Sequence, residues 1–155
     1  MAPLTLKLVG DTEVHITRRF AATPEAVWRA HTDPKIIPKW LTGPDGWTMT
    51  RCDMNPDGSI RYDWANTEGH SFHLTGELLE LDPPRRIVHV ERMFLPDPTP
   101  DNHVETTFEP DGAGGTLMRM VMRVPDRATR DAMVATGMAD GMEDSYARLE
   151  TMEAA

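Results

Sequence analysis

The chain has 155 residues, 39% of them apolar, and its 25 acidic and 16 basic residues give a formal net charge of −9. This composition is typical of a globular protein with one core, while the acidic balance disfavours nucleic acid as the main partner, because binding to phosphates needs a basic surface. The chain has no run of 18 apolar residues and no signal-like start, and its single cysteine, Cys52, favours a reduced, cytoplasmic protein without a membrane span.

The first predicted elements are a strand and two short helices. Alternating apolar and polar residues predict a strand at residues 14–20. Thr23 is a typical N-cap residue and Pro24 suits a first helical turn, so a short helix is expected to run to about Thr32. A proline at position 34 ends it, and a second short helix is expected over residues 35–41.

A series of strands follows, separated by turn signals. Pro, Gly, Asn and Asp cluster at residues 55–58, 66–69 and 111–115, where they favour tight turns. Consecutive strands joined by short turns pair antiparallel. Six strands are predicted here, at residues 47–52, 59–65, 71–81, 86–94, 103–109 and 116–124.

The last predicted element is one long helix, from the N-cap residue Asp126 to about Met152. Its small and apolar side chains fall within about 100° of arc, the width of a buried stripe. It is the only element long enough to cover the sheet. We therefore expect an α+β fold in one domain over residues 1–155, with a curved antiparallel sheet of about seven strands around a long C-terminal helix and two short helices after the first strand.

Four segments of the sequence carry a family resemblance. They lie at residues 22–40, 52–62, 76–88 and 135–149, and include ATPEAVW at residues 22–28, GE at 76–77 and DPPRRIV at 82–88. In this order and spacing they resemble the START-like, Bet v 1-like (SRPBCC) superfamily, and within it the branch of activators of heat-shock protein 90 ATPase homologues. The resemblance implies a helix-grip fold with a pocket between the sheet and the C-terminal helix.

Aromatic, methionine and small residues are the candidates to line that pocket. Methionine side chains adapt to ligands, although they also serve as ordinary core filling. Gly137 and Gly141, expected inside the long helix, leave room either for a closely packed strand or for a ligand. The candidate lining residues are Trp40, Tyr62, Trp64, Phe72, Met118, Met120, Met138, Gly141, Met142 and Ser145.

Three motifs that suggest metal or nucleophile chemistry have simpler explanations. Residues 53–58 resemble the start of a calcium-binding loop, but the required twelfth-position Glu is Trp64, so a hairpin turn is favoured. His70 and His73 are three residues apart, which places them on opposite faces of a strand. Cys52 lies in a predicted strand without a catalytic motif and is expected to be inert. We expect no metal and no cofactor.

Charged residues on the predicted strands are candidates for proton transfer, because an ionisable group that faces an apolar pocket has a perturbed pKa. Which strand face points inward cannot be assigned without the positions of bulges. The candidates are Asp63, Glu77, His89, Glu91 and Arg119. The basic pairs at residues 18–19 and 85–86 are expected to be solvated surface charges.

The leading hypothesis is a binding module for a hydrophobic or amphipathic small molecule, held between sheet and helix. One alternative is a cyclase- or dehydratase-like enzyme with an inward acid or base; the other is an interaction module of the chaperone-ATPase-activator type. The sequence favours binding over catalysis and names no catalytic residue. A homodimer through a sheet edge or a helix is also compatible with the sequence.

Overall fold

The computed structural model describes residues 2–154, with side chains up to residue 152. It contains one antiparallel sheet and four helices within that range. The elements in chain order are β1 (Thr5–Val9), β2 (Glu13–Phe20), α1 (Pro24–Thr32), α2 (Ile37–Trp40), β3 (Trp47–Met54), β4 (Ser59–Asn66), β5 (Ser71–Asp82), β6 (Arg86–Phe94), β7 (Asn102–Pro110), β8 (Thr116–Arg123), α3 (Arg127–Ala135) and α4 (Met138–Ala154).

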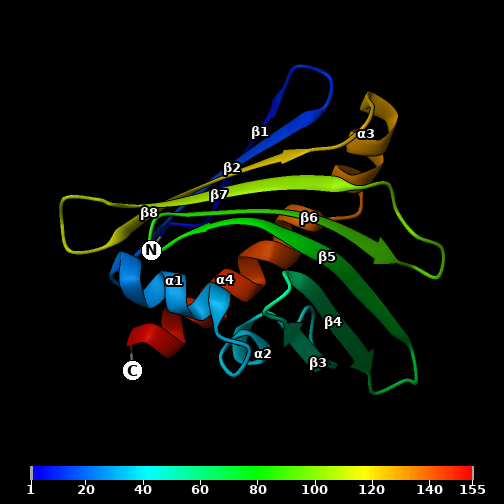
Figure 1. Cartoon of the computed structure of the whole chain (residues 1–155), viewed down its shortest axis with the longest axis horizontal. Helices are drawn as coiled ribbons and strands as arrows, with labels where there is room; N and C mark the ends of the chain where they lie inside the picture. The colour runs from blue at the N-terminus through cyan, green and yellow to red at the C-terminus, as the bar shows by residue number, and fades with distance from the viewer. Residues whose placement is uncertain (1, 155) are drawn as a thin grey trace.

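The sheet is strongly curved; α1, α2 and α4 lie on its hollow side, and α3 lies beyond the end of β8 (Figure 1). Its strand order is β1-β2-β8-β7-β6-β5-β4-β3, so β2 returns to pair with β8 while the other neighbours are consecutive in the chain. All pairs are antiparallel, as expected for strands joined by tight turns. The predicted α+β helix-grip fold is confirmed.

The sheet has eight strands within the described residues, one more than predicted. The additional strand is β1, which pairs with β2 from Thr5↔Thr17 to Val9↔Glu13. All five of its residues are exposed or half-buried. A strand at the edge of a sheet buries little, so its apolar and polar residues give only a weak periodic signal.

The predicted C-terminal helix is divided in two. Asp126 caps α3, as predicted, by accepting a hydrogen bond from the Thr129 backbone N–H at 2.8 Å. α3 ends at Ala135, and Gly137 then adopts a φ of +84°, which lies outside the helical region. Gly137 is therefore not a residue inside a long helix, as expected from the sequence, but the joint between two helices.

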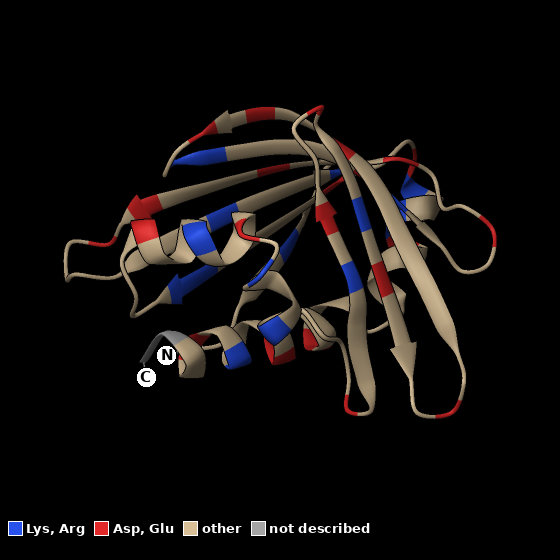
Figure 2. Ribbon diagram, turned by 60° about the horizontal axis from the view of Figure 1, so that its bottom comes forward, with Lys and Arg blue, Asp and Glu red and all other residues tan. Residues whose placement is uncertain are grey.

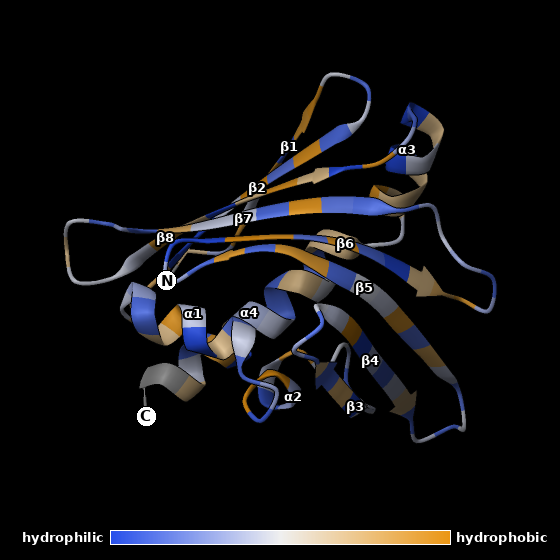
Figure 3. Cartoon of the chain, in the orientation of Figure 1, coloured by the Kyte–Doolittle hydropathy of each residue, from blue (hydrophilic) through white to orange (hydrophobic). Residues whose placement is uncertain are grey.

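The core lies between the inner face of the sheet and the helices. Apolar and polar residues alternate along the strands (Figure 3), so one face of each strand is apolar. At the α1 end the buried core joins Phe20, Phe108 and Met118 to Tyr146 and Leu149 of α4. None of the described helices is long and apolar enough to cross a membrane.

Candidate functional site

The inner face of the sheet can be assigned strand by strand from the register. On β7, Asn102, Val104, Thr106 and Phe108 are all buried, and directly opposed residues on neighbouring strands share a face. The three alternate methionines of β8 therefore lie on the inner face, as the period of two in the sequence suggested. These are Met118, Met120 and Met122, all buried.

The predicted lining residues fall into two groups. The buried group belongs to the packed core: Trp40, for example, stacks on Tyr146 at 5.9 Å between ring centroids, and its Nε1 donates a hydrogen bond to the backbone oxygen of Ala30. The second group is only half-buried, and its members other than Gly141 pack around the edges of the core clusters. The buried group is Trp40, Trp64, Met118, Met120 and Ser145; the half-buried group is Tyr62, Phe72, Met138, Gly141 and Met142.

Gly141 is a half-buried residue of α4 with open space where a side chain would lie. It lies on the same helix face as Met138 and the buried Ser145, three residues before and four residues after it. Apart from its chain neighbours and the backbone of its own helix, a Cβ added at Gly141 would meet no atom within 4 Å. The alternative that this glycine permits close packing of a strand is therefore wrong.

The ion pairs between α4 and β2 show which side of the helix faces β2. Arg18 is buried, and its guanidinium donates two hydrogen bonds of 2.9 Å to the Glu143 carboxylate and one of 3.0 Å to Glu150. Residues two apart on a helix point to nearly opposite sides, so Gly141 faces away from β2. The expectation that Arg18 is a solvated surface charge is wrong; Arg19, its neighbour, is the exposed one.

Of the five charged candidates on the strands, the structure brings two to the inner face. His89 is directly opposite the buried Val104, and Glu91 is opposite the buried Asn102. The Nε2 of His89 is 2.7 Å from a carboxylate oxygen of Glu91, close enough for a hydrogen bond. The side chain of His89 is 20% exposed and that of Glu91 is 23% exposed, so solvent reaches this part of the inner face.

The other three candidates alternate with buried inner-face residues and so lie on the outer face. Basic and acidic residues are interspersed along the strands (Figure 2). Asp63 pairs with Arg61 and Glu77 with Arg92, while Arg119 lies 4.0 Å from Glu109. These ion pairs account for their charges. They therefore contribute nothing to an inner site.

Two tyrosines lie close enough to Glu91 to feel its charge. Burial raises the pKa of Tyr62, with smaller contributions from Cys52 and Glu91. Burial likewise raises the pKa of Tyr146; the positive charge of Arg18 lowers it again, and Glu91 and Glu143 add to the rise. Both phenols are therefore protonated at neutral pH and can serve as hydrogen-bond donors.

The motifs that suggested metal or nucleophile chemistry have structural roles. The Asp57 carboxylate accepts hydrogen bonds from the backbone N–H and hydroxyl of Ser59, as in the predicted hairpin turn. His73 stacks on Phe94 at 4.4 Å, whereas His70 is exposed. Burial raises the pKa of the Cys52 thiol to about 11. Within the described residues, no group of three or more His, Cys, Asp or Glu side chains is placed to hold a metal ion.

Two recesses lie outside the inner face. A shallow groove of about 780 Å³ runs between the outer side of α4 and the segment around α2, and is lined by residues that include Ala147, Arg148, Lys39 and Asp45. A smaller one of about 290 Å³ lies beside the outer-face residues Arg61, Asp63 and His73. Both are open to solvent and bordered by charges.

Comparison with known proteins gives a family and a fold. The model of the family described as "Activator of Hsp90 ATPase homolog 1-like protein" matches residues 21–153. A crystal structure of a protein from Rhodobacter sphaeroides is similar over 99% of both chains, with 34% identity and a TM-score of 0.91. The AHSA1 protein from Silicibacter pomeroyi shares 21% identity over 92% of this chain and 97% of its own, with a TM-score of 0.74. None of the curated proteins compared with the chain matches it.

Proposed function

The chain belongs to the activator of Hsp90 ATPase homolog 1-like family, and from that premise we propose that it binds a hydrophobic or amphipathic small molecule between the inner face of the sheet and α4. The ligand is held by burial of its apolar surface, and a few polar groups orient it. Half-buried apolar side chains of the described inner face support this site. They include Tyr62, Leu78, Met93, Met138 and Met142.

The observation that carries the proposal is the unfilled position at Gly141. Protein interiors are normally packed to the density of organic crystals, so unfilled space on the core-facing side of a helix is uncommon. A glycine in the interior of a helix also destabilises it by about 1 kcal/mol relative to alanine. Gly141 combines unfilled space with a residue that destabilises the helix. This combination is expected where a bound ligand completes the packing.

A titration with a neutral apolar probe tests the proposal. The probe is 2-methoxynaphthalene, and its Kd is measured by ligand-observed NMR. Gly141→Leu fills the open space at Gly141, whereas Ala147→Leu adds the same kind of side chain in the outer groove. We expect the wild type and Ala147→Leu to bind alike and Gly141→Leu to lose at least about tenfold in affinity. If Ala147→Leu lost affinity and Gly141→Leu did not, the ligand would bind in the outer groove instead.

A second candidate function is acid–base catalysis, and the His89–Glu91 pair favours it. Two ionisable side chains face one region of the inner face, and His89 holds the carboxylate that would act as the base. The Glu91 carboxylate would remove a proton from an acidic C–H of the ligand, leaving an enolate; the proton exchanges with solvent, and a solvent-derived proton is then delivered to the same carbon. Exchange of the C1 hydrogens of 2-tetralone in D₂O, followed by NMR, tests this. Catalysed exchange that disappears in Glu91→Gln supports the enzyme; exchange at the buffer rate with bound probe rejects it.

A further inference from the structure

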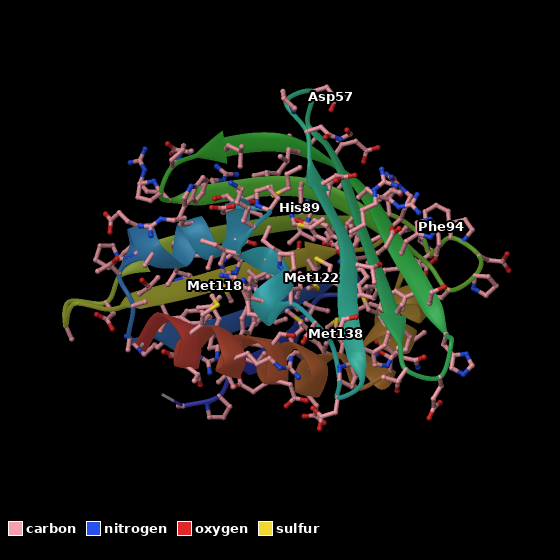
Figure 4. All side chains as sticks on the ribbon, turned by 90° about the horizontal axis from the view of Figure 1, so that it is seen from below. Asp57, His89, Phe94, Met118, Met122 and Met138 are labelled. Atoms are coloured by element: carbon pink, nitrogen blue, oxygen red, sulfur yellow. The ribbon has the colours of Figure 1, made fainter. Side chains whose placement is uncertain are left out.

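A polar cluster lies in the otherwise apolar inner face, where β6 and β7 run side by side. Glu91 and Asn102 are register partners, and His89 lies two residues from Glu91 on the same strand. Figure 4 labels His89 together with Met118 and Met122, whose side chains share the side of the sheet that faces the helices. Buried apolar neighbours surround the cluster, including Val104 and Leu74.

Asn102 has an unmet hydrogen-bonding requirement. Only 8% of the residue is exposed, and its Oδ1 is buried without a hydrogen-bond partner among the described residues. A buried carbonyl oxygen without a donor is destabilising, and such atoms are rare in folded proteins. A donor for this oxygen would therefore have to come from outside the described residues.

Glu91 offers a second acceptor in the same place. One carboxylate oxygen is paired with His89 Nε2, and this is the only hydrogen bond of the Glu91 side chain within the described part of the chain. The β-carbons of directly opposed residues in a sheet lie about 5 Å apart, so Glu91 and Asn102 can contact one head group.

The neighbouring strand β5 places no side chain directly opposite Glu91. Its register partner on β5 is Gly76, which has no side chain. A Cβ at Gly76 would lie 2.4 Å from the backbone oxygen of Val90, so no larger residue fits there without a backbone shift. The packing between β5 and β6 therefore requires glycine at this position, and β5 supplies no side chain to Glu91 there.

The chemistry of these groups selects a ligand class. Both free atoms accept hydrogen bonds, so they pair with a hydroxyl or an ammonium group. A ligand anion would be repelled by the carboxylate, and a hydrocarbon would leave Asn102 unpaired.

We propose that Glu91 and Asn102 form a hydrogen-bond-accepting anchor, with His89 as its positioning residue, which selects apolar ligands that carry a hydroxyl or ammonium head group. This inference rests on the proposed function and specifies its ligand class.

Four probes with one apolar body test the anchor. They are 2-naphthol, 2-(aminomethyl)naphthalene, 2-methoxynaphthalene and 2-naphthoate, and each Kd is measured by the same NMR titration at pH 7. The hydroxyl or the ammonium probe should bind about fivefold more tightly than the methoxy probe, a preference that corresponds to about 1 kcal/mol, and the carboxylate should bind most weakly. The tighter of the two donor probes identifies the head group.

Two variants of β7 test whether Asn102 causes the preference for hydrogen-bond-donating head groups. Asn102→Leu is similar in size and removes the acceptor, so it should reduce the donor preference to less than about twofold while the methoxy probe still binds. Thr106→Val changes a buried residue of the same face away from Glu91 and should keep the preference. Equal binding of all four probes by the wild type would overturn the anchor and leave the binding function standing. Absence of binding by every probe would instead reject the binding function itself.

Discussion

The two glycines of the C-terminal helical region should respond in opposite directions to the same substitution. In Gly141→Ala, the new methyl group enters space with no atom within 4 Å, so it meets no steric resistance. Alanine is favoured over glycine inside a helix by about 1 kcal/mol. Gly141→Ala should therefore raise the free energy of unfolding by about 1 kcal/mol.

Gly137 is the matched control. Its φ of +84° is accessible to glycine but strained for alanine, although open space surrounds this position as well. A left-handed backbone destabilises an L-residue by roughly 1–2 kcal/mol, so Gly137→Ala should lower the free energy of unfolding by about 1 kcal/mol once the lower entropy of the unfolded chain is included.

Urea unfolding followed by circular dichroism measures both changes. The melting temperatures should separate in the same directions, by roughly 2–4 °C for each kcal/mol. If Gly141→Ala destabilises the protein as much as Gly137→Ala does, the space at Gly141 is filled and the reasoning for an inner site is refuted.

Three further predictions concern buried polar groups. Arg18→Met should lower the free energy of unfolding by about 2 kcal/mol, because it removes the ion pair with Glu143. Arg19→Met, at the exposed neighbour, should change it by less than about 0.5 kcal/mol. Equal losses in urea unfolding would contradict the ionic connection to α4. The Arg18 hydrogen bonds lower the pKa of Glu143 below its ordinary 4.5, so this contribution is present above that pH and should fade as Glu143 is protonated in more acidic solution. Burial lowers the pKa of His31 to about 4, and since the unfolded chain binds this proton near pH 6.5, stability should fall between these values on acidification. From pH 7 to 5 the wild type should lose about 2 kcal/mol more than His31→Phe, and parallel pH profiles of the two would rule this out. The Cys52 thiol should react with iodoacetamide at pH 8 at least about tenfold more slowly than in urea, and rapid labelling of the native protein would contradict its raised pKa.

Local signals in the sequence determined most of the fold. Turn residues marked the ends of the strands, and the cap residues Thr23 and Asp126 lie where helices begin. The edge strand β1 was missed because it buries too little to show a periodic pattern. The break at Gly137 was missed because the apolar stripe continues in phase across it from Val134 to Met138.

The candidate site was harder to predict, because side-chain direction depends on pairing between distant strands. His89 and Glu91 could be assigned to the inner face only after the register with β7 was known, and an irregularity between Leu78 and Glu80 interrupts the alternation on β5. For Arg18 a signal existed: it alternates with Ile16 and Phe20, both buried, so the period of a strand already placed it inward. Neither the chaperone interaction nor the homodimer is tested by the fold, and both stay predictions.

Native mass spectrometry of the purified protein tests the central claim most directly, because a ligand bound on the inner face should be retained in the gas phase and released on denaturation. We predict an additional mass on the wild type and on Ala147→Leu that is absent from Gly141→Leu after loading with 2-naphthol. An additional mass of equal occupancy on Gly141→Leu, or none on any of the three, would contradict binding between the sheet and α4.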